Sequence, residues 1–412
     1  MSPKTIALFI GASLTCTILT AQPKKNAPPA LPEGNGKAQI EAACVQCHAL
    51  GMVTNAGHSR DEWATAVYMM INDGAPLPKD QVAAVVDYLA KNFPEKPRPS
   101  AVVIPGSVKV NFKEWDVPTP GSRPHDPLAA ADGSIWYTGQ MANVLGRVDP
   151  KTGKIQEFPI KTAQSGPHGL VQDKEGNIWF TANFKAYIGK FYPGTKEFSE
   201  YKLPPEARDP HTPLFDQKGT LWFTVQGANM VGRLDPKTGD VKVVTSPTPK
   251  SNPYGMVVTT KGVPVFVEFG APKVATIDPV SMEIKEYPLP DPAARPRRIA
   301  IAPDDTIWYS DYGRGYLGRL DLATGQVKEW LSPSGTESQP YGIVFLKGAV
   351  WYVESNALPN ALVRFDPKTE KFQTWRIPGG GGVVRNMMVT RDGNIAMAES
   401  GVNKIGLAEV SN

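Results

Sequence analysis

A unit of 43 residues recurs along most of this chain, and the repeat limits the folds that the chain can adopt. Its marker is a tryptophan, or a smaller apolar residue in its place, preceded by a Gly or Asp turn. The marker recurs at intervals of 43 residues, with a last interval of 45, at Trp136, Trp179, Trp222, Val265, Trp308, Trp351 and Ala396. Such a period, with several short strands in each unit, predicts a β-propeller, here with seven blades over residues 114–410.

Each unit reads as four alternating strands, which in the second unit are expected at 168–172, 177–181, 187–191 and 197–203. The seventh unit ends at 404–409 and has no outer strand of its own. The segment 113–118, ahead of the first blade, resembles the outer strands at 285–290 and 328–333. We therefore predict that this segment supplies the missing strand and closes the ring, so that no strand edge is left exposed.

Two rings of residues are expected at one mouth of the propeller channel. The inner ring follows the repeated prolines and consists of His125, His168, His211, Tyr254, Arg297, Tyr341 and Arg385. A partner ring lies fourteen residues further on, or thirteen in blade 6: Gly139, Ala182, Val225, Glu268, Asp311, Glu354 and Glu399. Since the two positions are expected to face each other across an antiparallel pair, Arg297–Asp311 and Arg385–Glu399 are candidate cross-strand ion pairs.

Three of the five histidines in the chain occupy the same inner-ring position in adjacent blades, at His125, His168 and His211. One interpretation is that these side chains only satisfy hydrogen bonds around a wet channel. The other is a binding or catalytic site. There, one imidazole could act as a general base, or the three could hold zinc or a transition metal. The three histidines are therefore the candidate catalytic residues, and a divalent metal is a candidate cofactor.

The N-terminal region carries Cys44-Val45-Gln46-Cys47-His48, the C-x-x-C-H pattern of covalent c-type haem attachment. The two thiols would bind the haem vinyl groups, and His48 would be the proximal iron ligand. A thioredoxin-like site is the first alternative, but no βαβ pattern surrounds the motif. A zinc site is the second, but it would need another pair of ligands.

Three amphipathic helices are expected around this motif, at 37–43, 60–72 and 78–92. The segment 35–93 resembles a class I cytochrome c, a small all-α domain in which a methionine is the second axial ligand of the haem iron. Met70 is the expected ligand, because it lies on the same helix face as Trp63. Met69 is the alternative, and Met52 lies too close to His48 along the chain to reach across the haem.

Residues 1–21 read as an export signal, because Lys4 precedes a short apolar run and small residues lead to Ala21. An uncleaved anchor and a lipoprotein cut at Cys16 are the alternatives. Cleavage leaves Cys44 and Cys47 as the remaining cysteines, and the mature chain is expected in the periplasm or otherwise outside the cytoplasm, with no membrane span. Residues 94–113 read as a stiff Pro-rich linker. The net charge of +4 gives no indication of nucleic-acid binding.

The repeats also resemble those of the virginiamycin B (streptogramin B) lyases, through Pro-His-Gly-Leu, Gly-Asn-Ile-Trp-Phe-Thr and Ile-Gly-Lys within 167–190. The resemblance spans all seven blades. It implies opening of a cyclic depsipeptide ester by elimination, with a His base and a magnesium ion held by carboxylates. Glu268 and Glu354 are the candidate magnesium ligands. The blades that carry the histidines have Gly139, Ala182 and Val225 at the partner position.

The sequence therefore predicts a multidomain protein, with a small all-α cytochrome c domain followed by an all-β seven-bladed propeller. We expect an exported monohaem cytochrome that transfers electrons to or from a redox partner protein. Its propeller would bind a small molecule or a partner, and an oxidoreductase activity would use the haem. The alternative is a carbon–oxygen lyase, or another non-redox enzyme, with an accessory haem domain. A non-catalytic binding module is a third interpretation.

Overall fold

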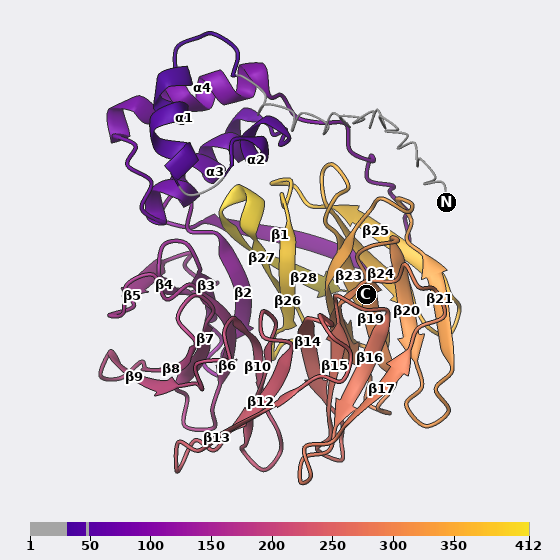
Figure 1. Ribbon diagram of the computed structural model, residues 1–412. Coiled ribbons are helices and arrows are strands. Elements are labelled where there is room, and N and C mark those ends of the chain that lie inside the picture. The colour runs from indigo at the N-terminus through magenta and orange to yellow at the C-terminus, as the bar shows by residue number, and fades with distance from the viewer. Residues whose placement is uncertain (1–30, 47–48, 412) are drawn as a thin grey trace, which may run out of the picture.

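The computed structural model describes residues 31–46 and 49–411, which form a group of short helices followed by a ring of seven four-stranded antiparallel sheets (Figure 1). Cys47, His48 and the predicted export signal at 1–21 lie outside the described residues. The ring confirms the seven-bladed propeller. The helices form where the sequence predicts them, but the fold alone does not identify them as a cytochrome c domain. None of the helices in these residues is long and apolar enough to cross a membrane.

The helical segment comprises α1 (Lys37–Ala43), η1 (Cys44–Gln46), α2 (Gly51–Thr54), α3 (Arg60–Asn72), η2 (Lys79–Gln81) and α4 (Val82–Asn92). A capping box starts α3: Ser59 accepts a hydrogen bond from the backbone of Glu62, and the Glu62 side chain accepts one from the backbone of Ser59. Trp63 and Val67 of α3 pack against Val85 and Leu89 of α4 in one core. The apolar stripes of these two helices thus face each other, as their periodicity predicts.

The strands of the first four blades follow the chain from the channel outward. They are β2 (Pro124–Ala129), β3 (Ile135–Gly139), β4 (Val144–Val148) and β5 (Ile155–Pro159); β6 (Pro167–Gln172), β7 (Ile178–Ala182), β8 (Tyr187–Tyr192) and β9 (Glu197–Lys202); β10 (Pro210–Phe215), β11 (Leu221–Val225), β12 (Met230–Leu234) and β13 (Val241–Thr245); β14 (Pro253–Val258), β15 (Pro264–Glu268), β16 (Lys273–Ile277) and β17 (Ile284–Pro288).

Blades 5 and 6 repeat this order with β18 (Pro296–Ile301), β19 (Ile307–Asp311), β20 (Tyr316–Leu320) and β21 (Val327–Leu331), then β22 (Pro340–Leu346), β23 (Ala349–Glu354), β24 (Ala361–Asp366) and β25 (Lys371–Arg376). Blade 7 contains β26 (Val384–Val389), β27 (Ile395–Glu399) and β28 (Lys404–Ser411), with η3 (Ser400–Val402) between the last two. Its outer strand is β1 (Lys109–Asp116), which pairs antiparallel with β28. The predicted closure of the ring is therefore confirmed, although β1 starts and ends earlier than the predicted segment 113–118.

Buried tryptophans of the repeat form much of the packing between blades. Trp179 and Trp222 are completely buried, and their indole N–H groups donate to Asp173 Oδ2 at 2.8 Å and to Asp216 Oδ2 at 3.0 Å. The aspartate belongs to the turn six residues before the tryptophan. Each such blade therefore satisfies the polar atom of its largest core residue internally, which removes the cost of burying it.

The helical segment contacts the propeller through α3. Asn72 Nδ2 donates to the carbonyl oxygens of Pro120 at 3.0 Å and Gly121 at 3.2 Å, and Gln164 Nε2 donates to the carbonyl oxygen of Asp73 at 3.4 Å. Gly121 has a φ of 64°, and a Cβ atom there would lie 2.5 Å from the backbone nitrogen of Met69, so this approach requires glycine. The contacts come from the loops before β2 and β6, the innermost strands of blades 1 and 2.

The Pro-rich segment after α4 follows the surface of blade 6. Ser100 forms a bridge with Leu358, the backbone N–H of Val102 donates to Ser334 Oγ at 3.1 Å, and that of Ile104 donates to Thr374 Oγ1 at 2.7 Å. The segment is thus attached to the propeller over several residues before it enters β1.

Candidate functional site

A β-bulge at the start of the innermost strand determines which side chains enter the channel. In blade 1, Pro124 pairs with Gly139 but Pro127 pairs with Tyr137, so β2 contains one extra residue between these positions. The innermost strands of the other six blades carry the same irregularity after their first proline or, in blade 7, valine. A bulge can turn two consecutive side chains toward one face. His125 and Asp126 are accordingly both buried around the channel.

A hydroxyl group on the second strand fixes this bulge and joins neighbouring blades. Thr138 Oγ1 accepts from the backbone N–H of Asp126 at 3.1 Å and donates to the backbone carbonyl of His168 in the next blade at 2.7 Å. Thr181 makes the corresponding bond to the carbonyl of His211 at 2.7 Å, and Thr224 to that of Tyr254 at 2.7 Å. The hydroxyls therefore position the inner ring through its backbone while leaving its side chains available.

The structure brings the three predicted histidines together. The ring centroids of His125 and His168 are 3.6 Å apart, those of His168 and His211 are 3.8 Å apart, and His211 lies 3.8 Å from Tyr254. All three imidazoles are buried, with 1–3% of their surface exposed. The inner ring thus forms a continuous row of tilted aromatic rings, extended by a hydrogen bond between the hydroxyl groups of Tyr254 and Tyr341.

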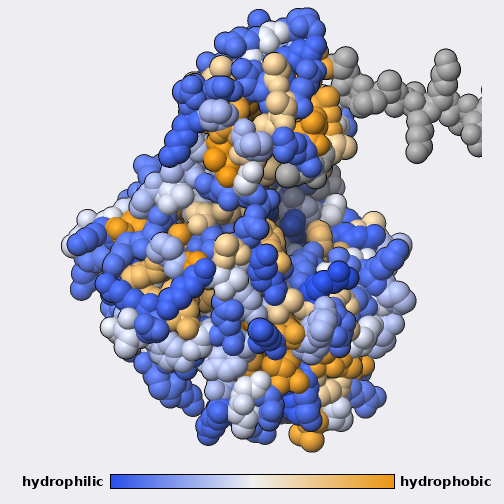
Figure 2. Space-filling model, turned by 60° about the vertical axis from the view of Figure 1, so that its left-hand side comes forward, coloured by the Kyte–Doolittle hydropathy of each residue, from blue (hydrophilic) through white to orange (hydrophobic). Residues whose placement is uncertain are grey.

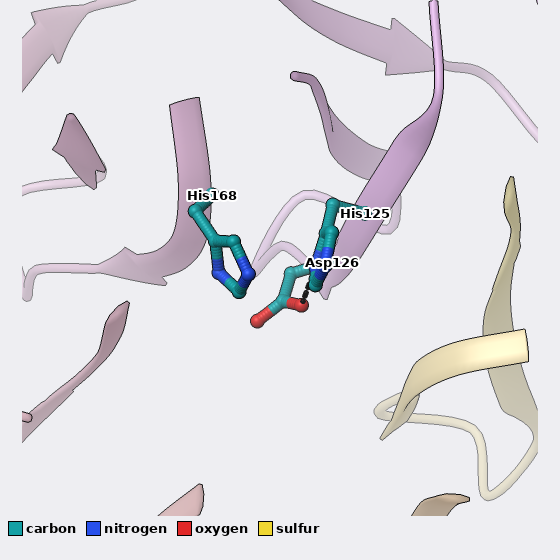
Figure 3. A group of neighbouring side chains, drawn as sticks. All are labelled: His125, Asp126 and His168. Atoms are coloured by element: carbon teal, nitrogen blue, oxygen red, sulfur yellow. Dashed lines mark hydrogen bonds and ion pairs between the residues drawn. The ribbon is translucent and has the colours of Figure 1, made fainter. Parts of the chain in front are cut away.

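Asp126 is the centre of a buried polar network that the sequence reading missed. Its carboxylate accepts from Arg298 Nη2 at 2.7 Å and from Asn386 Nδ2 at 3.0 Å, and Oδ1 lies 2.9 Å from His125 Nδ1 (Figure 3). Arg298 also donates to Thr212 Oγ1 at 3.3 Å. The network joins blades 1, 3, 5 and 7 across the channel. Beyond it, toward the other end, lies a cavity of about 330 Å³.

The three imidazoles are held in the neutral form. Burial lowers the pKa of His125 well below its ordinary value, and the nearby Arg385, Arg123 and Arg298 lower it further. Burial likewise lowers the pKa of His168 and of His211 well below the ordinary value, and in each case a neighbouring histidine adds to the effect. A neutral imidazole has a lone pair that can accept a proton, but the lowered pKa makes each of these rings a weaker base than an ordinary histidine.

The partner ring does not face the inner ring as the sequence reading expected. The prolines, not the inner-ring residues, pair with it: Pro253 pairs with Glu268 and Pro296 with Asp311. Because side chains alternate along a strand, this offset of one residue turns the carboxylates away from Tyr254 and Arg297. Asp311 forms an ion pair with Arg314 at 2.7 Å. Neither Arg297–Asp311 nor Arg385–Glu399 is an ion pair in the part of the chain that the structure describes, so this prediction is wrong.

The two glutamates predicted as magnesium ligands are separately engaged. Glu268 accepts a hydrogen bond from the hydroxyl of Ser246, and Glu354 accepts from the backbone N–H of Ser334 at 2.7 Å and from its hydroxyl. Burial raises the pKa of both carboxyl groups, which disfavours the anionic form that magnesium needs. Neither belongs to a cluster of three candidate ligands in the part of the chain that the structure describes. These residues do not fit a magnesium site.

One other arrangement has the geometry of a metal site. Ligand atoms of His125, Asp126 and His168 all lie within 4.8 Å of one another, and Figure 3 shows the His168 ring turned toward the other two side chains. The carboxylate is already bonded by Arg298 and Asn386, however, and the surrounding arginines repel a cation. The nitrogen and oxygen donors are of the kinds that bind a transition metal, but the positive charge around them opposes binding of a cation.

An apolar cavity of about 410 Å³ lies among the helices. Cys44 and Met70 both line it, together with apolar residues that include Trp63, Val67 and Leu89. Met69 does not line it; its backbone lies against Gly121 of the propeller instead. Hydrophobic residues show at the surface of the helical segment in Figure 2, among the hydrophilic ones, and Met52, another cavity residue, is 67% exposed.

The comparisons with known proteins concern the propeller. Residues 105–346 match the virginiamycin B lyase family. A streptogramin B lyase structure is 25% identical, with a TM-score of 0.67 over 73% of this chain and 98% of that chain. The selenomethionine-substituted virginiamycin B lyase from Staphylococcus aureus is 23% identical, with a TM-score of 0.66 over 73% of this chain and 99% of that one.

A more distant similarity shows the fold alone: Kuenenia stuttgartiensis hydrazine synthase is 14% identical, with a TM-score of 0.58 over 69% of this chain and 95% of that chain. The search of curated proteins found no match. The family match excludes the helical segment, so the haem motif stays a prediction, and the lyase-like interpretation of the propeller is the better supported one. Since the matched residues make up more than half of the sequence and carry the repeats that build the ring, this chain belongs to the virginiamycin B lyase family.

Proposed function

We propose that the helical segment carries a covalently attached haem c and that the protein transfers electrons outside the cytoplasm. The observation that supports this is the apolar cavity lined by both Cys44 and Met70. Cys44 and Cys47 would hold the haem, with His48 and Met70 as axial ligands. Such a haem supplies one-electron chemistry. The helices of this chain exclude water around it, through the core of Trp63 and its neighbours.

The contacts between the two parts of the chain favour a role for both in one process. Asp73 lines the same cavity as Met70, and its backbone carbonyl accepts a hydrogen bond from Gln164. Gln164 lies in the loop that leads to His168, and Gly121, beneath α3, lies in the loop that leads to His125. A haem in the cavity would thus lie at the histidine end of the channel. We propose that electrons pass between a ligand or partner bound there and the haem.

The test is haem analysis of protein secreted by a host that attaches haem c. We expect covalent haem, visible after denaturing electrophoresis, that cycles between oxidation states. The Met70→Ala variant should lower the reduction potential and allow added imidazole to bind the iron, whereas Met69→Ala should change neither property. Mature protein without covalent haem would refute the proposal. If only Met69→Ala changed the reduction potential and imidazole binding, Met69 and not Met70 would be the axial ligand.

The family membership favours a second candidate function, a carbon–oxygen lyase activity of the propeller. Its support is the row of neutral imidazoles at the channel mouth, any of which could remove a proton from a bound substrate. The family resemblance links this activity to magnesium, but Glu268 and Glu354, which would hold the ion, do not fit it. A lyase built on this site would therefore rely on its own side chains for charge stabilisation.

A streptogramin B antibiotic is the probe for this second function, with the linear product detected by mass spectrometry. Ring opening by the full chain, retained when haem attachment is blocked by Cys44→Ala, would support the lyase. Loss of activity in only one of the three alanine variants of His125, His168 and His211 would identify the base. Absence of ring opening under all conditions would leave the electron-transfer proposal in place and refute the lyase.

A further inference from the structure

Three arginines at the histidine end of the channel have buried nitrogen atoms without a hydrogen-bond partner. They are Arg123, next to the first proline of blade 1, and the inner-ring residues Arg297 and Arg385. The Nε atom of each is inaccessible to solvent, and none has a partner among residues 31–46 and 49–411. The same holds for Nδ1 of His168. Arg298 Nε is in the same state, but the other nitrogens of Arg298 are bonded by Asp126 and Thr212. Such atoms are rare in folded proteins, because an unsatisfied buried donor costs free energy.

The positive charge at this end of the channel is not balanced. Arg298 has an anionic partner in Asp126, and that carboxylate is also shared with Asn386. Asp311, Glu268 and Glu354 of the partner ring are bonded elsewhere, and Asp209, ahead of β10, is bonded by the side chain of Asn183. Burial and the neighbouring Glu114 raise the pKa of Glu399, which disfavours its anionic form. Arg123, Arg297 and Arg385 form no ion pair among the residues that the structure places. Three guanidinium groups thus share one partly buried region without a counter-ion.

These arginines lie close enough to affect one another. Burial lowers the pKa of Arg123 to about 9, and the charges of Arg385 and Arg297 contribute to this shift. Arg297 lies over the face of Tyr341, with 4.0 Å between its guanidinium carbon and the ring centroid, and 4.3 Å from that of Tyr312. Stacking of this kind stabilises the cation and leaves the N–H groups at its edge for an acceptor.

We propose that Arg123, Arg297 and Arg385 form a binding site for a small oxyanion, such as a carboxylate or phosphate group, at the histidine end of the channel. Guanidinium groups bind such groups through charge-assisted hydrogen bonds, often in pairs. An anion there would supply both the missing charge and the missing acceptors. His168 adds a neutral donor. The inference depends on neither the haem nor the lyase activity, and it names the ligand class of the propeller.

The main competing occupant is a metal ion on His125, Asp126 and His168. A cation bound there would have Arg298 in direct contact with one of its ligands, and Arg123 and Arg385 nearby. Coulomb repulsion in a site with few solvent contacts is stronger than in water. The positive charge therefore favours an anion over a cation at the histidine end of the channel, and binding measurements with both kinds of ion distinguish the two.

The test is thermal unfolding and calorimetry of the full mature chain, with total ionic strength held constant by sodium chloride. The probes are inorganic phosphate, succinate, zinc chloride and the neutral polyol erythritol. We expect saturable binding and a rise in unfolding temperature with phosphate or succinate, and neither effect with erythritol. The tighter of the two anions identifies the oxyanion type. Absence of saturable anion binding to the wild-type protein would overturn the proposal. Stabilisation by zinc alone would replace it with a metal site.

Matched arginine variants locate the site. Arg385→Gln and Arg123→Gln should each weaken anion binding on the order of tenfold or more, because each removes a charge-assisted hydrogen bond. Both should also raise the unfolding temperature in the absence of anion, since they relieve repulsion. The control is Arg319→Gln in β20, where the arginine is exposed to solvent. An equal loss of binding in the control would show that the anion binds the surface non-specifically.

Discussion

The buried Asp126–Arg298 pair gives the sharpest test of how the channel is held together. Arg298 Nη2 lies 2.7 Å from Asp126 Oδ1, and both side chains are almost completely buried. Replacing Arg298 with Met removes this bond and leaves a buried carboxylate without its cationic partner. We expect the free energy of unfolding to fall by about 3–5 kcal/mol, as when one member of a buried pair is lost. Urea unfolding followed by tryptophan fluorescence measures the change.

The double variant Asp126→Leu with Arg298→Met decides whether the loss comes from the unpaired charge. Replacing both members with apolar side chains of similar size should recover most of the stability, because no buried charge of the pair is left without a partner. The more exposed Arg147–Asp132 pair, 2.8 Å long, is the control, and its disruption should cost about 0–1 kcal/mol. Additive losses in the double variant, or equal losses at the buried and exposed pairs, would refute this reasoning.

Three further predictions concern other parts of the site. Because burial lowers the pKa of His168, the unfolded chain takes up a proton at a higher pH than the folded chain does. The free energy of unfolding of the wild type should therefore fall, relative to that of His168→Gln, by about 1.4 kcal/mol per pH unit as the pH falls from 6 to 5. Urea unfolding measures this change. Trp222→Ala should cost about 3–5 kcal/mol, and Trp222→Phe less, in the same assay. Gly121→Ala should loosen the contact with Met69, which faster hydrogen exchange in α3 would reveal; unchanged exchange would contradict it.

The repeat made the propeller predictable in detail. The period of 43 residues placed the five marker tryptophans and each inner strand, and the likeness of segment 113–118 to outer strands predicted the closure by β1. Helices α1 and α3 begin and end where their apolar spacing indicated. These features depend on local pattern or on a repeat of it, so a single chain contains the information needed to infer them.

The channel network was not predictable in the same way. Asp126 and Arg298 are 172 residues apart and meet only because the ring closes. Strict alternation of side chains along β2 would also have placed Asp126 on the opposite face from His125. The β-bulge after Pro124 changes this. The local sequence indicates the bulge only through the proline that starts the inner strand in six of the seven blades. The same one-residue shift explains why the carboxylates of the partner ring were assigned to the channel.

The histidines and the arginines of the channel mouth depend on each other electrostatically. After burial, Arg385 and Arg123 are the largest causes of the low pKa of His125. An oxyanion bound to these two arginines would cancel part of their field and so raise the pKa of the imidazole. By linkage, protonation of His125 would in turn strengthen binding of the anion by the same free energy. If the proposed site is correct, ligand binding and proton uptake in this channel are coupled, which is a property that a proton-transferring site on this fold could use.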